Sequence, residues 1–98
     1  MLRVKVYEHN DIAIFLRDEK ERFFNAIIES IEYGLNENKD IVRVAEFLVT
    51  TSDTIQEIDI EKPHWEESLY LALYYFERHQ EYEKCGKLKN LIDKIYHD

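Results

Sequence analysis

The side chains of this 98-residue sequence that could do chemistry include one cysteine and four histidines. Lys84 and Lys87 could lower the pKa of the Cys85 thiol, but neither is a base poised beside it. We therefore interpret Cys85 as a small packed residue. His9, His64, His79 and His97 lack the Cys/His spacing of a zinc site, so we expect no bound metal.

Catalytic motifs are also missing from the sequence. It contains no Gly-rich phosphate loop, no HExxH motif and no nucleophile motif. The carboxylates of Asp59 and Glu61 stand two residues apart, which is common on the exposed face of a strand. We predict a protein that is not an enzyme and that needs no cofactor.

Tyrosines are the better candidates for a functional surface, because a tyrosine ring offers a large rigid area with a polar tip. Tyr70 and Tyr74 fall on the side of a predicted helix that faces away from its main apolar stripe. The alternative is that these rings cover the sheet or the helix predicted at 18–36. We predict the following residues to bind a partner protein: Tyr70, Tyr74, Tyr75, Tyr82 and Lys87.

Composition and charge limit the class of protein. Apolar residues make up 45% of the chain, which is ordinary for one globular domain and too rich for a disordered segment. The formal charge of −8 opposes non-specific binding to a phosphate backbone, so we expect no nucleic-acid partner. No apolar run is long enough for a membrane span or a secretory signal. With a single cysteine, these features indicate a cytoplasmic protein without membrane contact.

The first third of the sequence predicts a strand followed by a helix. Leu2, Val4 and Val6 alternate with polar residues, as in a half-buried strand. Residues 12–16 fit either a second strand or the entry to a helix. Residues 18–36 have an apolar stripe at helical spacing, with Gly34 and Asn36 as stop signals.

Residues 40–61 are ambiguous. Ile41, Val44 and Leu48 would fit one face of a helix, but ten residues of the segment are β-branched and suit a pleated surface. We favour a hairpin with strands near 41–49 and 54–60 and a turn near Thr51–Thr54.

The C-terminal part predicts two antiparallel helices, 63–79 and 82–96, joined by a short link at 79–81. Pro63 suits the first turn of the first helix. Cys85, Leu88, Ile92 and Ile95 repeat at steps of three, four and three in the second. We expect the small pair Cys85 and Gly86 to permit close packing near the link. The alternative is that Gly86 ends a helix that runs through the link.

Residues 82–92 resemble the UVR motif, a helical hairpin named for the bacterial excision-repair proteins UvrB and UvrC and also found in adaptors of the Clp protease system. Tyr82, Glu83, Leu88 and Ile92 match the pattern. Cys85 and Gly86 stand where the motif has two alanines, and Lys89 and Asn90 replace its Arg-Asp pair. The resemblance implies a hairpin that contacts another protein. The first 60 residues resemble no family.

Together these features predict a single α+β domain over residues 1–98. A small antiparallel sheet with one helix would occupy residues 1–61, and a helical hairpin would occupy residues 62–98. The predicted function is a non-enzymatic protein–protein interaction module, an adaptor or regulatory subunit, that docks through the hairpin onto another protein or a second copy of this chain. The alternative is an acidic inhibitor that mimics nucleic acid and occupies a basic groove of its target. It is based on the charge of −8 and on Asp53, Glu57, Asp59 and Glu61.

Overall fold

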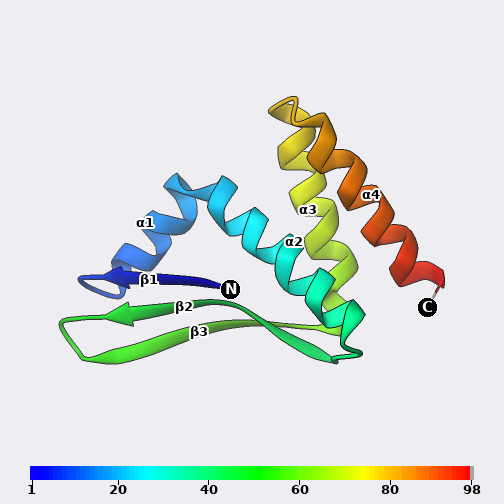
Figure 1. Cartoon of the computed structure of the whole chain (residues 1–98). Helices are drawn as coiled ribbons and strands as arrows, with labels where there is room; N and C mark the ends of the chain where they lie inside the picture. Colours follow the sequence, from blue (N-terminus) through cyan, green and yellow to red (C-terminus); the bar gives the residue numbers. More distant parts are fainter. Residues whose placement is uncertain (98) are drawn as a thin grey trace.

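The computed structural model describes residues 1–97 and has the predicted α+β architecture (Figure 1). Three strands form one sheet: β1 (Leu2–Val6), β2 (Ile41–Val49) and β3 (Thr54–Glu61). Four α-helices accompany it: α1 (Asn10–Asp18), α2 (Lys20–Asn36), α3 (Trp65–Arg78) and α4 (Tyr82–His97). A single turn of 3₁₀ helix, η1 (Lys62–His64), joins β3 to α3. No helix among residues 1–97 is long and apolar enough to cross a membrane.

The helices all lie to one side of the sheet (Figure 1). α1 and α2 pass over this face, and α3 and α4 rise from the end at which β3 finishes. Outward-facing residues of the strands, such as Arg3, Lys5 and Arg43, are exposed. The sheet therefore has one covered face and one open face.

The predicted hairpin at 41–60 is confirmed. β2 and β3 pair antiparallel, and the turn between them contains Asp53 at a φ of 52°. β1 instead pairs parallel with β2, because the chain returns through α1 and α2 before it re-enters the sheet. The sheet is thus mostly antiparallel, with one parallel edge strand that the sequence pattern did not distinguish.

A β-bulge at Val44 changes which residues of β2 face outward. Arg43 pairs with Asp59 and Ala45 pairs with Ile58, so Val44 is one extra residue in β2. Val44 and Ala45 are both fully buried. As a result Arg43 and Glu46, which would point to opposite faces of a regular strand, both lie on the open face.

Residues 12–16, which fitted either strand or helix, belong to helix α1. Phe15 packs edge-on against Phe47 of β2, with ring centroids 5.5 Å apart. The interpretation of Gly34 as a stop signal is wrong, because α2 continues to Asn36 and Gly34 is buried within it. Its missing side chain makes room for Val42 and Trp65.

The predicted C-terminal hairpin is confirmed: α3 and α4 lie antiparallel and in contact (Figure 1). Gln80 in the link has a φ of 58°, which lets the chain reverse within three residues. Cys85 is buried, as expected. The expectation for Gly86 is wrong: it is exposed, and a Cβ there would meet no atom within 4 Å.

The core lies between the covered face of the sheet and helices α2, α3 and α4. Its largest fully buried side chains are Trp65, Phe47, Phe76, Ile31, Leu69 and Leu88. These residues come from four elements, α2, β2, α3 and α4. The core therefore holds the C-terminal hairpin to the rest of the domain.

Candidate functional site

Helix α3 is fixed in place by its inner side. Trp65, Leu69, Ala72, Leu73 and Phe76 are buried at helical spacing. The indole Nε1 of Trp65 donates a hydrogen bond of 2.9 Å to the carbonyl oxygen of Ile60. This bond and the buried stripe set the rotation of α3, and so decide which of its residues face solvent.

The opposite side of α3 exposes large apolar side chains. Leu71 is 58% exposed and Tyr74 is 62% exposed. Single exposed apolar residues are common, but neighbouring ones on a rigid helix are a feature of interaction surfaces. We use the term outer face of α3 for the surface formed by Glu67, Leu71, Tyr74, Tyr75 and Arg78.

A groove of about 700 Å³ runs between the C-terminal half of α3 and the corner where α1 meets α2. Its lining residues are Arg17, Asp18, Lys20, Phe24, Leu71, Tyr74, Tyr75, Arg78 and His79. Three of these side chains are cations and one is a carboxylate, so this end of the outer face is basic although the whole chain is acidic.

Aromatic contacts hold the groove in shape. The ring of Tyr75 lies 5.1 Å from that of Phe24 and 4.2 Å from that of His79, measured between centroids. The guanidinium of Arg78 lies over the ring of Tyr74 at 5.5 Å from its centroid, within the range of a cation–π contact. Both tyrosines line the groove, but Tyr75 is packed within it whereas Tyr74 stays largely exposed.

Arg17 and Asp18 pair with each other at the edge of the groove, at 2.8 Å between Nε and Oδ1. This hydrogen bond lowers the pKa of the Asp18 carboxyl group. Among residues 1–97, Lys20 and Arg78 have no carboxylate within ion-pair distance. The charges of these two cations are therefore not balanced by an ion pair within this part of the chain.

A second hollow of about 460 Å³ lies at the N-terminal half of α3. Its lining residues are Asp59, Ile60, Glu61, His64, Glu67, Ser68 and Leu71. Leu71 lines both this hollow and the groove. The outer face of α3 therefore changes from acidic at one end to basic at the other, with Leu71 between them.

The five predicted binding residues do not form one surface. Tyr74 and Tyr75 line the groove together. Tyr82 is exposed at the start of α4, and the Lys87 ammonium pairs with Glu32 of α2 at 3.4 Å. Only two of the five predicted residues thus belong to the outer face.

Tyr70 is half exposed and faces the C-terminal end of α4. There the Tyr96 hydroxyl donates a hydrogen bond to the Glu66 carboxylate at 2.5 Å. This bond raises the pKa of Tyr96 to about 12, because ionised Tyr96 could not donate it. Tyr70 therefore belongs to a separate polar contact between the two helices of the hairpin.

The sequence did contain a signal for Leu71 and Arg78, which were missed. They follow the predicted residues Tyr74 and Tyr75 at helical spacing, as i and i+7 around i+3 and i+4. The contributions of Arg17, Lys20 and Phe24 could not be found this way, because tertiary packing brings the α1–α2 corner beside α3.

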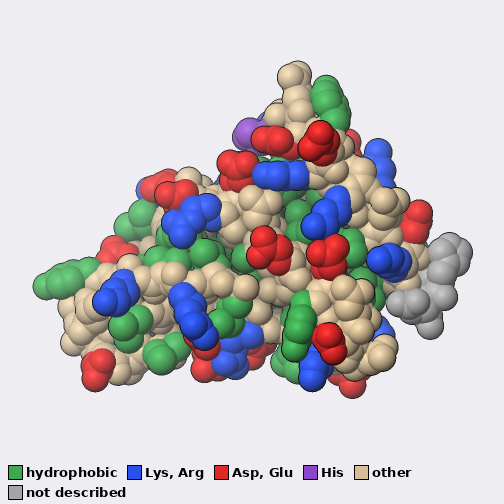
Figure 2. Space-filling view, viewed as in Figure 1, with side chains coloured by type: hydrophobic (Ala, Val, Ile, Leu, Met, Phe, Trp, Pro, Cys, Tyr) green, Lys and Arg blue, Asp and Glu red, His purple; other side chains and the backbone are tan. Residues whose placement is uncertain are grey.

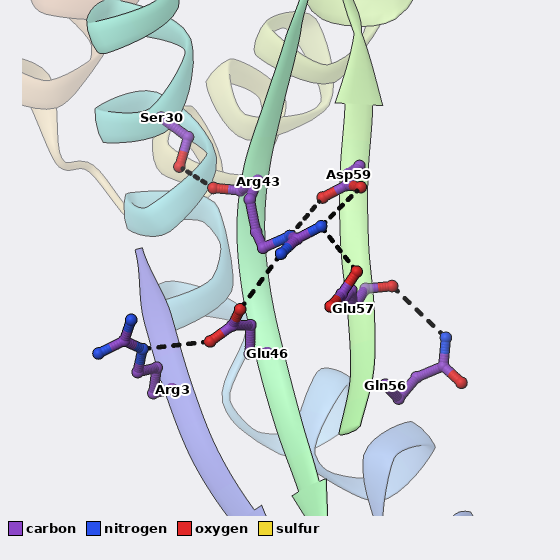
Figure 3. Close-up of polar contacts among 7 residues, drawn as sticks. All are labelled: Arg3, Ser30, Arg43, Glu46, Gln56, Glu57 and Asp59. Atoms are coloured by element: carbon purple, nitrogen blue, oxygen red, sulfur yellow. Dashed lines mark hydrogen bonds and ion pairs between the residues drawn. The ribbon is translucent and has the colours of Figure 1, made fainter. Parts of the chain in front are cut away.

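The open face of the sheet carries a charge network centred on Arg43 (Figure 3). Its guanidinium pairs with Asp59 at 2.8 Å, with Glu57 at 2.6 Å and with Glu46 at 3.3 Å. The hydrogen bonds from Arg43 hold the pKa of Asp59 below its usual value. Arg3 extends the network by pairing with Glu46 at 3.2 Å. Two carboxylates of the acidic stretch 53–61 are thus already bound within the chain.

Among residues 1–97, no group of three or more His, Cys, Asp or Glu side chains is placed to hold a metal ion. Cys85 is buried, and within residues 1–97 no basic side chain is hydrogen-bonded to its thiol. The outer face of α3, with its exposed Leu71 and Tyr74 and its adjoining groove, is the candidate site.

Comparison of the chain with protein-family models, with curated proteins and with solved structures gave no match. The resemblance to the UVR motif accordingly stays a prediction from residues 82–92 alone.

Proposed function

We propose that this chain is a non-enzymatic protein–protein interaction module, an adaptor or regulatory subunit, that docks through its C-terminal hairpin. The docking surface is the outer face of α3. The observation that carries this proposal is the exposure of Leu71 and Tyr74 on a helix whose other side is fully packed. Burying such side chains against a partner would remove apolar area from water at the centre of a contact.

The rigid setting of the surface supports this proposal. Phe24 and Tyr75 are already packed together, so the groove exists before a partner arrives. A preformed surface loses less conformational entropy on binding than a mobile one. The hairpin also has the antiparallel form that the UVR resemblance implies.

The alternative of a nucleic-acid mimic receives less support. Arg43 binds the carboxylates of Glu57 and Asp59, two of the four on which that alternative is based. On the face shown in Figure 2, acidic and basic side chains are interspersed and form no single acidic field. A mimic would lose affinity for its target steeply with added salt, whereas an apolar contact centred on Leu71 would not.

Photo-cross-linking in the native cell tests the proposed docking surface. A photoreactive phenylalanine analogue is placed at Tyr74 in one variant and at Tyr33 in a matched control. Tyr33 is 57% exposed but lies on α2, outside the outer face of α3. We expect a discrete cross-linked protein from position 74, lost when Leu71→Ser is added, and none from position 33. Equal products from both positions, or none from position 74, would refute this docking surface.

A further inference from the structure

Four exposed residues form a straight seam along the outer face of α3. Glu67, Leu71, Tyr74 and Arg78 follow at steps of four, three and four. At 100° per residue they fall within about 60° of one another around the helix axis. This is the spacing through which two helices pack along their length.

The ends of the seam carry opposite charges, and its centre is apolar. Glu67 lines the acidic hollow and Arg78 lines the basic groove. Among residues 1–97, neither side chain has an ion-pair partner. The seam therefore offers one unpaired charge of each sign on the two sides of Leu71 and Tyr74.

The order of these residues makes the seam complementary to itself. The midpoint between Glu67 and Arg78 falls between Ala72 and Leu73, and so does the midpoint between Leu71 and Tyr74. A two-fold axis through that point, perpendicular to α3, would align a second α3 antiparallel to the first. Glu67 of each copy would then stand opposite Arg78 of the other, and Leu71 opposite Tyr74.

We propose that the outer face of α3 docks onto the same face of a second copy of this chain, as an antiparallel pair of helices about a two-fold axis. This inference rests on the proposed function and specifies that the partner is a second copy of the chain. A contact of this kind uses the same patch on both copies, which requires self-complementary charge of the kind described.

The hollows beside the seam repeat the same complementarity. Lys20 flanks the Arg78 end, and Glu61 flanks the Glu67 end. Arg17 and Asp59 line the same two hollows but already pair with Asp18 and Arg43. In the antiparallel pair, the basic corner of each copy would face the acidic hollow of the other. A purely acidic partner would be repelled by Glu67 and Glu61, and a purely basic partner would be repelled by Arg78 and Lys20. A second copy avoids both repulsions and therefore fits better than either.

Charge-reversal variants test this arrangement by sedimentation of the purified chain over a concentration series. Glu67→Arg and Arg78→Glu should each weaken self-association by about tenfold or more, because each places like charges opposite one another twice. An equimolar mixture of the two variants should regain association, since an arginine of one chain would then face a glutamate of the other at both ends of the heterodimer. Lys89→Glu, on the exposed side of α4, changes the net charge as Arg78→Glu does and should leave association unchanged.

The outcomes separate this inference from the proposed function. A wild-type chain that stays monomeric, or a mixture that does not regain association, overturns the self-pairing. If position 74 then cross-links to a different protein in the cell, the proposed docking function stands and only its partner changes. If position 74 cross-links to nothing, both proposals fail. Circular dichroism of each variant confirms that the exposed substitutions have left the fold intact.

Discussion

Gly34 of α2 lies directly against the indole of Trp65, the first residue of α3. A Cβ atom on Gly34 would stand 2.7 Å from Cη2 of Trp65 and 2.6 Å from Cγ1 of Val42. Both neighbours are buried in the core, so one of these side chains would have to shift to admit a methyl group. The glycine that permits close packing is therefore Gly34, where α2 meets β2 and the base of the hairpin, and not Gly86.

We expect Gly34→Ala to destabilise the protein despite the higher helix propensity of alanine. Overpacking of a well-filled core typically costs about 1–3 kcal/mol in the free energy of unfolding. Gly86→Ala is the matched control, because its new methyl group would meet no atom within 4 Å. It should stabilise α4 by up to about 1 kcal/mol. Urea unfolding measures the change in the free energy of unfolding for each variant, and the two changes should have opposite signs. Equal changes would contradict this explanation.

Tyr74→Ala should weaken binding of the partner far more than it lowers the melting temperature. Loss of an aromatic anchor typically costs about 2 kcal/mol or more of binding free energy. Loss of an exposed side chain changes the folding free energy by about 0.5 kcal/mol or less. Calorimetric titration or sedimentation measures the binding free energy, and a thermal melt measures the stability. The control Tyr33→Ala should strongly change neither the affinity nor the melting temperature. If Tyr74→Ala caused a large loss of stability and left the affinity unchanged, the binding site would have to lie elsewhere.

The Arg43–Asp59 pair should make stability depend on pH in the acid range. Because Arg43 lowers the pKa of Asp59 in the folded state, the pair stabilises the fold above the unfolded pKa of about 3.9. That stabilisation is lost as the pH falls through the lower, folded-state pKa. The stability difference between wild type and Asp59→Asn should thus be constant near neutral pH and shrink at acid pH. Urea unfolding over a pH series measures it.

Asp53→Asn provides the control for that series. Asp53 lies in the β2–β3 turn and has no ion-pair partner among residues 1–97. Its positive φ also suits asparagine. A difference for Asp59→Asn that stayed the same down to strongly acid pH would show that Arg43 does not stabilise the ionised carboxylate.

Cys85 should report on the packing of the hairpin. Its side chain is only 5% exposed, so a thiol reagent should react with it slowly until the protein opens. Leu88→Ala, which leaves a cavity in the adjacent packing, should accelerate labelling. A Gly86→Cys variant in a Cys85→Ala background should label rapidly in the folded state. Fast labelling of native Cys85 would mean that α4 is not held against α3.

The sequence by itself determined the elements whose signal is local. The alternation of Leu2, Val4 and Val6, the β-branched residues of 41–60 and the helical stripes of α3 and α4 each depend on neighbours within a few residues. Their periods of two and 3.6 follow from backbone geometry alone. The exposure of Tyr74 was predictable for the same reason, because it lies opposite the stripe that contains Leu69 and Phe76.

Tertiary structure alone decided which of these surfaces meet. The parallel pairing of β1, the bulge that turns Arg43 and Glu46 to one face, and the contact of Gly34 with Trp65 depend on residues far apart in the chain. Such contacts are selected by the packing of the whole core, which a local pattern does not encode. For the same reason, the groove between Lys20 and Arg78 exists only once α2 and α3 have packed together.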